Sequence, residues 1–363
     1  MIISWIYPKT EKCGINHYSI AYISAIGNLG VEINAIPWSS LRESHKLKDI
    51  NKSDLVHIQY EPSIFLNKNK DFYPKLCAKI NKPLIVTLHE IYETFPGVFP
   101  KSKIRGRLKL LKELIYDYRH SAQTAFYRNL NNSFYSDQII VHHNFQKKIL
   151  VKKGMSAENI AVSGFPVKHE SEYRESKPQK TVQLGCAGFI NSQFDYELLF
   201  QLLSKLKIKW NFTWVGGVRL SDHNYLQTSI EQKIKQLNWE NKFNITGYLD
   251  INNYEQEIRK LDVGLCLFSN RSASKSISDM MAEGVIIACS CIEMTEEIAA
   301  EYNPVFMLSP NCLDAAAQIE QLSTNHRLRT KIQEGMGHYT KKYSIENLAA
   351  KTLNLYKKKI LNV

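Results

Sequence analysis

The sequence has no apolar run long enough to cross a membrane. Its 363 residues are 44% hydrophobic and 23% charged, values typical of a globular protein. A spanning helix needs roughly 18 or more consecutive apolar residues. The first residues, MIISWIYPKTEKCG, also lack the basic, apolar and small-residue order of a signal peptide, and they predict a buried strand followed by a loop. The length suits two domains, each large enough to bury a core.

Cysteine pairs with metal-binding or redox spacing are absent as well. The cysteines are odd in number, include no Cys-x-x-Cys motif, and four of them lie within or beside apolar strand-like runs. This pattern predicts reduced thiols in a cytosolic protein, with no disulfide framework and no zinc site. Cys289 and Cys291 would share one face of a strand, where core filling is the better interpretation. The seven positions are 13, 77, 186, 266, 289, 291 and 312.

The second half of the chain has little net charge. Residues 1–165 carry a net charge of +10 out of the total of +12, and the remaining residues carry +2. Two parts with such different charge indicate two domains with different partners. A nucleic-acid-binding protein would explain the charge together with 19 Tyr and 15 Phe, but no recognition-helix, RRM or OB pattern is present. We therefore expect no nucleic-acid partner.

Strand-like and helix-like segments alternate through the first half. Helical spacing covers 15–30 and 145–154. The predicted strands are IISWIY (2–7), VEINAIPW (31–38), DLVHIQYEP (54–62), PLIVTLHE (83–90), DQIIVHHN (137–144) and NIAVSGFPV (159–167). This order predicts a parallel sheet with helices on both faces.

Several of these strands end abruptly in polar side chains. Ligands bind at the carboxyl ends of the strands of an open parallel sheet, so we expect these side chains to gather near a site. Neighbours on a strand point to opposite faces, and one member of each His-Glu or His-His pair is therefore expected to be structural. The polar residues are His57, Gln59, Glu61, His89, Glu90, His142, His143 and Asn144.

Residues 168–180, KHESEYRESKPQK, predict a linker because they are charged, poor in aliphatic residues and contain a proline. The alternation then begins again. Predicted strands lie at 181–189, 211–218, 241–249, 261–268, 285–290 and 305–310, with helices between them and to the end. The chain is thus predicted to hold two doubly wound α/β domains, at 1–167 and at 181–343.

The stretch RSASKSISDMMAEGVIIACS (271–290) places serines and one lysine at the start of a helix that leads into a buried strand. Helix N-termini carry free amides, which bind anions together with small hydroxyl side chains. The alternative is that the serines only cap the helix, which they do whatever the ligand. Gly284 is expected to permit the tight exit into the strand VIIACS.

Eight stretches together match a known pattern: CGINHYS (13–19), DLVHIQYEPSIF (54–65), TLHE (87–90), GCAGF (185–189), WVGGV (214–218), ITGYL (245–249), the 271–290 stretch and the final helical segment. In their order and spacing, over nearly its whole length, the chain resembles retaining glycosyltransferases of the GT-B fold, family 4 (glycosyl transferases group 1). The resemblance implies two Rossmann-like domains facing a cleft. It implies a nucleotide-diphospho-sugar on the C-terminal domain, an acceptor on the N-terminal domain, and a last helix, about 344–363, that crosses back to the N-terminal domain.

The resemblance also implies a donor-binding set. Lys275 would neutralise phosphate charge, Asp279 matches the carboxylate that holds the ribose hydroxyls, and the backbone around Tyr248 would select the base. The full set is Gly14, Gly188, Phe189, Gly216, Gly217, Arg219, Gly247, Tyr248, Leu249, Ser272, Ser274, Lys275, Ser276 and Asp279.

The implied reaction is retaining hexosyl transfer from a UDP- or GDP-linked sugar. Helix N-termini and cations would stabilise the departing diphosphate without a metal or another cofactor, and the sequence has no Asp-x-Asp motif. His89 matches the histidine near the reacting sugar. Glu61 and Glu90 are alternative hydrogen-bonding partners for sugar hydroxyls.

The chain departs from the family's pattern at two places. Arg271 and Asp279 stand where the family has Glu-x7-Glu, and GFINSQFDYE (188–197) contains neither the usual Arg nor the usual Lys. Arg219, Lys275 and Arg271 are the candidates to replace those cations. The alternatives are a catalytically weak or silent GT-B partner subunit, a GT-B epimerase, or a phosphorylase.

Residues 101–128 bear on the acceptor. They contain eight Lys or Arg against two acids, interleaved with apolar residues at roughly helical spacing. Such a helix can lie on an anionic membrane surface, or it can pack its apolar stripe on its own domain. The first interpretation predicts a peripheral enzyme on the inner face of the plasma membrane, which extends a lipid-linked glycan in bacterial surface polysaccharide synthesis.

Overall fold

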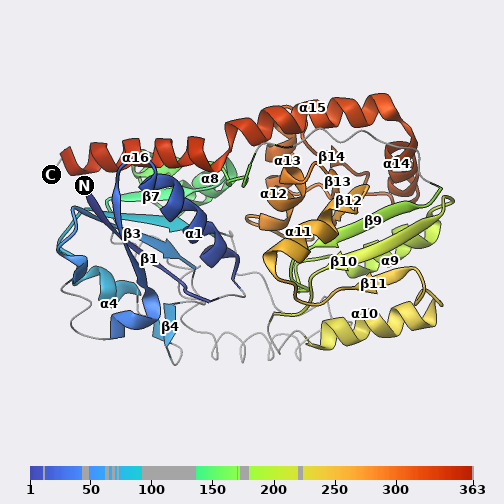
Figure 1. The fold of residues 1–363 in the computed structure, drawn as a ribbon, viewed down its shortest axis with the longest axis horizontal. Coiled ribbons are helices and arrows are strands. Elements are labelled where there is room, and N and C mark those ends of the chain that lie inside the picture. The colour runs from blue at the N-terminus through green and yellow to red at the C-terminus, as the bar shows by residue number, and fades with distance from the viewer. Residues whose placement is uncertain are drawn as a thin grey trace. The chain divides into compact units, whose positions relative to one another are not determined.

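The computed structural model describes residues 1–10, 13–42, 49–61, 65–67, 70–71, 73–91, 136–169, 171, 180–219 and 224–361. The chain forms two compact units (Figure 1). Unit 1 comprises Met1–Gly164 and Ile345–Val363, and unit 2 comprises Phe165–Ser344. Among the described residues, no helix is long and apolar enough to span a membrane.

Unit 1 is built on a parallel sheet of six strands in the order β2-β1-β3-β6-β7-β8. The strands β3, β6 and β7 are buried along their whole length, as expected for a sheet covered on both faces. The strand bounds are β1 (Ile2–Tyr7), β2 (Glu32–Pro37), β3 (Leu55–Tyr60), β6 (Leu84–Leu88), β7 (Gln138–Val141) and β8 (Ile160–Val162).

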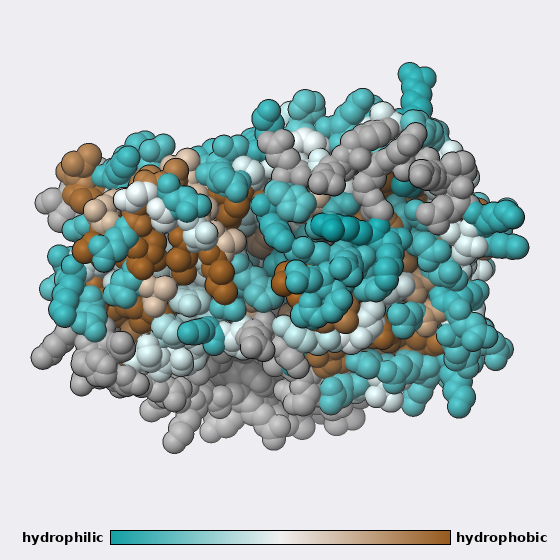
Figure 2. All heavy atoms as spheres, in the orientation of Figure 1, coloured by the Kyte–Doolittle hydropathy of each residue, from teal (hydrophilic) through white to brown (hydrophobic). Residues whose placement is uncertain are grey.

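Helices and short elements complete unit 1. They are α1 (Gly14–Gly27), η1 (Trp38–Arg42), α4 (Tyr73–Cys77), α8 (Asn144–Lys152), η2 (Ala157–Asn159), α16 (Ile345–Leu361) and the two-stranded pair β4 (Leu66–Asn67) and β5 (Lys70–Asp71). Apolar side chains reach the surface over the part of unit 1 where α1 lies (Figure 2), and Ile20 on this helix is 54% exposed.

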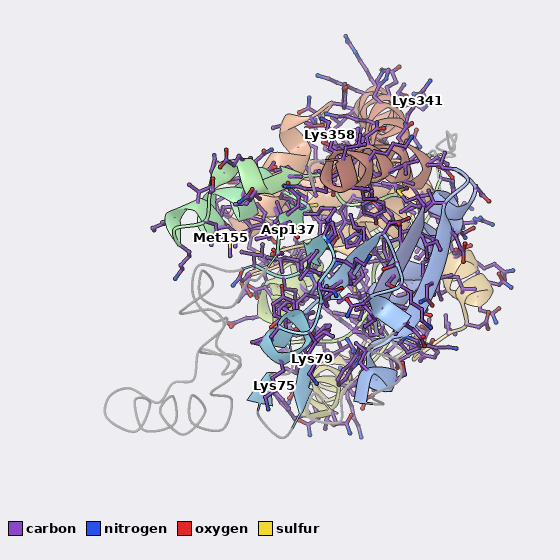
Figure 3. All side chains as sticks on the ribbon, turned by 90° about the vertical axis from the view of Figure 1, so that its left-hand side faces the viewer. Lys75, Lys79, Asp137, Met155, Lys341 and Lys358 are labelled. Carbon is purple, nitrogen blue, oxygen red and sulfur yellow. The ribbon has the colours of Figure 1, made fainter. Side chains whose placement is uncertain are left out.

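The last helix, α16, packs on unit 1 although it follows unit 2 in the chain. It contacts α1, and its Tyr356 is fully buried. At the edge of the sheet, the carbonyl oxygen of Asp137 accepts from Lys359 Nζ over 2.9 Å, and Asp137 Oδ2 accepts from the Leu84 amide over 2.7 Å. Figure 3 shows Asp137 in the view that looks at unit 1 end-on. These contacts make the helix an integral part of unit 1.

Unit 2 holds a second parallel sheet, in the order β11-β10-β9-β12-β13-β14. In sequence rank this is 3-2-1-4-5-6, the order of a Rossmann domain, with its switch point between β9 and β12. The strands are β9 (Val182–Ala187), β10 (Trp210–Val215), β11 (Phe243–Ile245), β12 (Val263–Cys266), β13 (Ile286–Cys289) and β14 (Phe306–Met307). The helices are α9 (Tyr196–Lys205), α10 (Asn224–Gln236), α11 (Ile251–Arg259), α12 (Lys275–Ala282), α13 (Glu293–Ala300), α14 (Cys312–Thr324) and α15 (His326–Lys342).

The predicted fold class, two doubly wound α/β domains, is confirmed. Each predicted strand is present in one of the two six-stranded sheets. The stretch 285–290 forms the fully buried strand β13, and Gly284 joins it to α12 with a φ of 67°, a left-handed conformation that glycine adopts readily. All seven cysteines are unbridged.

Candidate functional site

The donor-binding residues expected from unit 2 lie on the loops at the carboxyl edge of its sheet. Gly188 and Phe189 follow β9, Gly216 and Gly217 follow β10, and Gly247 to Leu249 follow β11. The helix α12 begins at Lys275, a few residues after the end of β12. We call these three loops and the first turn of α12 the loop cluster.

Glycines allow the three loops to approach one another closely. A Cβ at Gly216, whose φ is 135°, would collide with the carbonyl oxygen of Gly188, and one at Gly217 would lie 3.1 Å from the Cα of Gly247. The Gly216 amide donates to Thr246 Oγ1 over 2.9 Å, and Trp214 Nε1 donates to the Gly188 carbonyl over 3.0 Å. Side chains larger than hydrogen would therefore separate the loops.

The loop after β9 also lies against the start of α12. A Cβ at Gly188, whose φ is 103°, would lie 3.6 Å from the Cβ of Ser276. The loop after β9 and the first turn of α12 are therefore close to van der Waals contact. That turn presents amide groups and the partial positive charge of the helix dipole, which attract anions.

The serines of the 271–290 stretch divide into two groups. Ser272 and Ser274 are buried, and Ser274 is the N-cap of α12, because its Oγ accepts from the Ile277 amide over 3.4 Å. Ser276 is half-buried, and its Oγ lies 2.9 Å from that of Ser274. The capping interpretation therefore holds for Ser274, and Ser276 is the most accessible of the three donor-set serines.

Lys275 and Asp279 form an ion pair within α12. Lys275 Nζ lies 2.6 Å from Oδ1 and 2.7 Å from Oδ2 of Asp279. The Tyr254 hydroxyl, from α11, donates to the same Oδ2 over 3.2 Å. Tyr254 was not expected from the sequence, because nothing in its own segment distinguishes it and it lies 25 residues from Asp279.

The other two candidate cations differ in their surroundings. Arg219 is exposed and its guanidinium carbon lies 5.9 Å from the centre of the Phe189 ring, so it borders the loop cluster. Arg271 donates through Nε to the Ala273 carbonyl over 2.8 Å and through a terminal nitrogen to Gln193. Its cationic group therefore braces the segment before α12.

Tyr248 is 44% exposed, and the backbone of Gly247 has a φ of 72°. The loop from Gly247 to Leu249 leads directly into α11, whose N-cap is Asp250. The loop that was expected to meet the base is thus continuous with the helix that carries Tyr254.

In unit 1 the expected catalytic residues follow β3 and β6. The His89 amide donates to the Tyr60 carbonyl over 3.3 Å, so Glu61, His89 and Glu90 lie at the same edge of the sheet. Glu61 and Glu90 are half-buried, whereas His89 is 5% exposed. Gly14, from the donor-binding set, begins α1 in this same unit.

A buried hydrogen-bonded chain occupies the space between these strands. His89 Nε2 lies 2.9 Å from Gln59 Oε1, and His89 Nδ1 lies 3.2 Å from His142 Nε2, so both ring nitrogens of His89 have protein partners. The chain continues from Gln59 to His57, and from His57 to Thr87 and to the Tyr356 hydroxyl of α16. We call His57, Gln59, His89, His142 and Tyr356 the histidine chain.

Burial keeps these imidazoles neutral. It lowers the pKa of His57 and of His142 to about 3, and it lowers the pKa of His89 well below its usual value, with His142 as a second cause. The two pairs of adjacent polar residues at the strand ends differ in burial. His89 is buried beside the half-buried Glu90, as alternation predicts, but both His142 and His143 are buried.

Among the residues that the structure describes, no three His, Cys, Asp or Glu side chains are grouped so that they could hold a metal ion. Residues 101–128 lie outside the described residues.

Solved structures with the same architecture cover the full chain. A glycosyltransferase from Rickettsia africae ESF-5 is 17% identical, with a TM-score of 0.71, over 100% of this chain and 99% of that one. Sucrose-phosphate synthase from Thermosynechococcus elongatus is 11% identical, with a TM-score of 0.74, over 100% of both chains. Anabaena Alr3699/HepE, in complex with UDP and glucose, is 12% identical, with a TM-score of 0.69, over 99% and 100%.

The fold is GT-B. No protein-family profile matches the sequence, and no curated protein matches it significantly. The likeness to these structures is one of fold, since all three identities lie below 20%. In this GT-B chain the loop cluster belongs to unit 2 and the histidine chain to unit 1.

Proposed function

We propose that this protein is a glycosyltransferase that moves a sugar from a nucleotide-diphospho-sugar to a glycan acceptor. The observation that carries the proposal is the loop cluster. Three glycine loops and the N-terminus of α12 meet at the carboxyl edge of a sheet with Rossmann strand order, beside Lys275 and Asp279. Solved proteins of the same fold include one with UDP and glucose bound.

The donor would bind with its diphosphate at the first turn of α12. Ser276 and the helix amides would donate to phosphate oxygens, Lys275 and Arg219 would neutralise their charge, and Asp279 would accept from the ribose hydroxyls. The base would meet the loop at Tyr248. Support comes from the close approach of the three loops to one another and of Gly188 to Ser276.

In the transfer, the bond between the anomeric carbon and the diphosphate oxygen breaks and a bond to the acceptor oxygen forms. The proton of the acceptor hydroxyl passes to the departing diphosphate. Stabilisation of that leaving group by the helix N-terminus and cations makes the proposed reaction independent of a metal, and we propose that it retains the anomeric configuration. Proton nuclear magnetic resonance of the first product anomer tests retention.

For unit 1 we propose the acceptor site. Both ring nitrogens of His89 have protein partners, so we assign the sugar-hydroxyl contacts to the half-buried Glu61 and Glu90 and give His89 the role of holding the ends of β3 and β6 together. A lipid-linked acceptor in surface polysaccharide synthesis is proposed from the basic segment 101–128.

Thermal-shift binding of UDP, GDP, ADP and their sugars tests the proposal. We expect one nucleotide family to raise the melting temperature of the wild type, with a smaller shift for Lys275→Ala and for Asp279→Ala. Lys260→Ala is the matched control. Lys260 is exposed, follows the last residue of α11 and forms an ion pair with Glu257 of that helix. A folded wild type that shifts with none of the nucleotides would contradict the proposal.

A second candidate is a catalytically silent GT-B partner subunit. One observation favours it: Arg271 and Lys275 both form hydrogen bonds with protein groups. Among the described residues of the donor set, Arg219 is then the exposed cation beside the loop cluster. Nucleotide-sugar binding without turnover, across a broad panel of acceptors, would support this candidate over the transferase.

A further inference from the structure

Tyr254 reaches from α11 to α12 and ends on the Asp279 carboxylate. Its hydroxyl donates to Oδ2 over 3.2 Å. Burial raises the pKa of Tyr254 well above its usual value, and the charge of Asp279 raises it further, so the phenol stays protonated and serves as a donor. A hydrogen bond from a neutral donor to a carboxylate fixes the rotation of that carboxylate.

Lys275 contacts the same carboxylate from within α12. Its Nζ lies 2.6 and 2.7 Å from the two oxygens, so with Tyr254 the carboxylate has three close contacts. A carboxylate has about four lone-pair sites, whereas a vicinal diol has two hydroxyls to place. The Asp279 side chain is still 16% exposed, so a ligand can reach it. In this arrangement Lys275 blocks part of the acceptor capacity that a ribose needs.

We propose that Tyr254 is a positioning residue for the ribose-binding carboxylate of Asp279. We further propose that Lys275 acts as a latch, by which we mean that its ion pair keeps ribose from Asp279 until the diphosphate of the donor draws the ammonium away. The inference rests on the proposed function. When a nucleoside diphosphate arrives, its phosphates attract the Lys275 ammonium away from Asp279. The lone pairs released on Asp279 accept from the two ribose hydroxyls. Tyr254 keeps its hydrogen bond and prevents the carboxylate from turning to follow the lysine.

If Lys275 acts as a latch, one substitution should change the affinities for nucleoside and nucleoside diphosphate in different directions. A nucleoside has to break the ion pair and offers nothing to the ammonium, whereas a diphosphate replaces the carboxylate as its partner. Lys275→Met removes both the latch and the phosphate contact. It should raise the affinity for a nucleoside severalfold and lower the affinity for the diphosphate by about tenfold or more.

Tyr254→Phe should act on both ligands alike. The ring and its packing remain, and the carboxylate loses its fixed orientation, so both affinities should fall by roughly three- to tenfold with their ratio unchanged. The matched controls are Tyr225→Phe, in which an exposed tyrosine of the same unit loses its hydroxyl, and Lys260→Met, in which a lysine outside the loop cluster is removed. Neither control should change either affinity.

A double-variant cycle separates positioning from a general effect on the fold. If Tyr254 acts through Asp279, Tyr254→Phe should have no further effect once Asp279→Asn is present. Independent losses in the two variants would overturn the positioning role. The comparison requires that circular dichroism and the melting temperature show each variant to be folded.

The measurement is calorimetric titration of the full-length protein with three pairs of ligands: uridine and UDP, guanosine and GDP, adenosine and ADP. If the wild type binds a diphosphate and Tyr254→Phe leaves both affinities of that pair unchanged, the positioning role is wrong while the proposed function stands. If Lys275→Met leaves the nucleoside affinity unchanged or lowers it, the latch is wrong. If the wild type binds no diphosphate, the proposed function itself fails.

Discussion

His57 of β3 and Tyr356 of α16 share a buried hydrogen bond although they lie 299 residues apart in the chain. Both side chains are almost completely buried, so the bond joins the last helix to the centre of the unit 1 sheet. Loss of the Tyr356 hydroxyl leaves a buried ring nitrogen without this partner. The helix and the histidine chain should therefore depend on each other for stability.

Tyr356→Phe should lower the free energy of unfolding of unit 1 by about 1–3 kcal/mol, the usual cost of an unpaired buried polar group. Urea denaturation followed by circular dichroism measures this. Tyr302→Phe is the matched control, since Tyr302 is 50% exposed, and it should change the free energy of unfolding by less than about 0.5 kcal/mol. Equal effects of the two substitutions would show that the buried bond contributes nothing.

The buried histidines of unit 1 should make this unit sensitive to acid. Burial lowers the pKa of His57 and His142 to about 3, and His143, also buried, to about 4. The unfolded chain binds protons as the pH falls through about 6.5, while the folded chain stays neutral, so stability is lost below that pH and the loss is complete only below the folded pKa values. Each such histidine should cost roughly 2 kcal/mol at pH 5.

Urea midpoints measured between pH 7.5 and pH 4.5 test this prediction. Replacing His143 by Gln should flatten the profile, because one lowered pKa is removed. Replacing His326, which is exposed at the start of α15, should leave the profile unchanged. A stability that is constant from pH 7.5 to pH 5 would contradict the neutral, buried state of these rings.

Two glycines in α15 should respond in opposite directions to alanine. A Cβ at Gly335 would collide with the backbone carbonyl of Tyr302, whereas one at Gly337 meets nothing within 4 Å. Gly337→Ala should raise the free energy of unfolding of unit 2 by up to about 1 kcal/mol, and Gly335→Ala should lower it by about 1–3 kcal/mol. Thermal unfolding of the two variants shows whether each one is stabilised or destabilised. A change in the same direction for both would contradict the close packing of Gly335 against the Tyr302 carbonyl.

The basic segment 101–128 is predicted to bind anionic membranes. At low salt, the protein should co-sediment with vesicles of phosphatidylglycerol and phosphatidylcholine. It should not co-sediment with vesicles of pure phosphatidylcholine. Changing Lys103 and Arg105 to Glu should weaken this binding about tenfold or more, since each charge near the surface contributes about 1 kcal/mol. Equal sedimentation with both kinds of vesicle would exclude an electrostatic contribution.

Local patterns predicted the sheets well and their ends less well. The strand expected at 2–7 forms β1 with those bounds, and its neighbours alternate with helices as expected. The helix expected at 15–30 ends at Gly27, since the chain turns before Gly30, which has a φ of 80°. The strand expected at 211–218 stops at Val215, because Gly216 leaves the sheet with a φ of 135°. Periodicity identifies the apolar middle of an element. It does not show whether a glycine near the end belongs to the element or to the loop that follows.

Contacts between residues close in the chain follow from local structure, whereas contacts between distant segments do not. Lys275 and Asp279 lie one helical turn apart, so their meeting on one face of α12 follows from the helix repeat. The contact of Asp279 with Tyr254 depends on how α11 packs on α12, and the engagement of both His89 nitrogens depends on strands brought together by the sheet. Such long-range contacts have no local signature, which is why Tyr254 and Tyr356 were not identified from the sequence.

Hydrogen–deuterium exchange of the full-length protein, with and without UDP, GDP or ADP, tests the central claim most directly. We predict that one nucleotide slows exchange in peptides covering 188–190, 216–219 and 274–279, and that Asp279→Ala abolishes this protection. Unchanged exchange in these peptides with all three nucleotides, in a protein that is folded, would contradict a donor site at the N-terminus of α12.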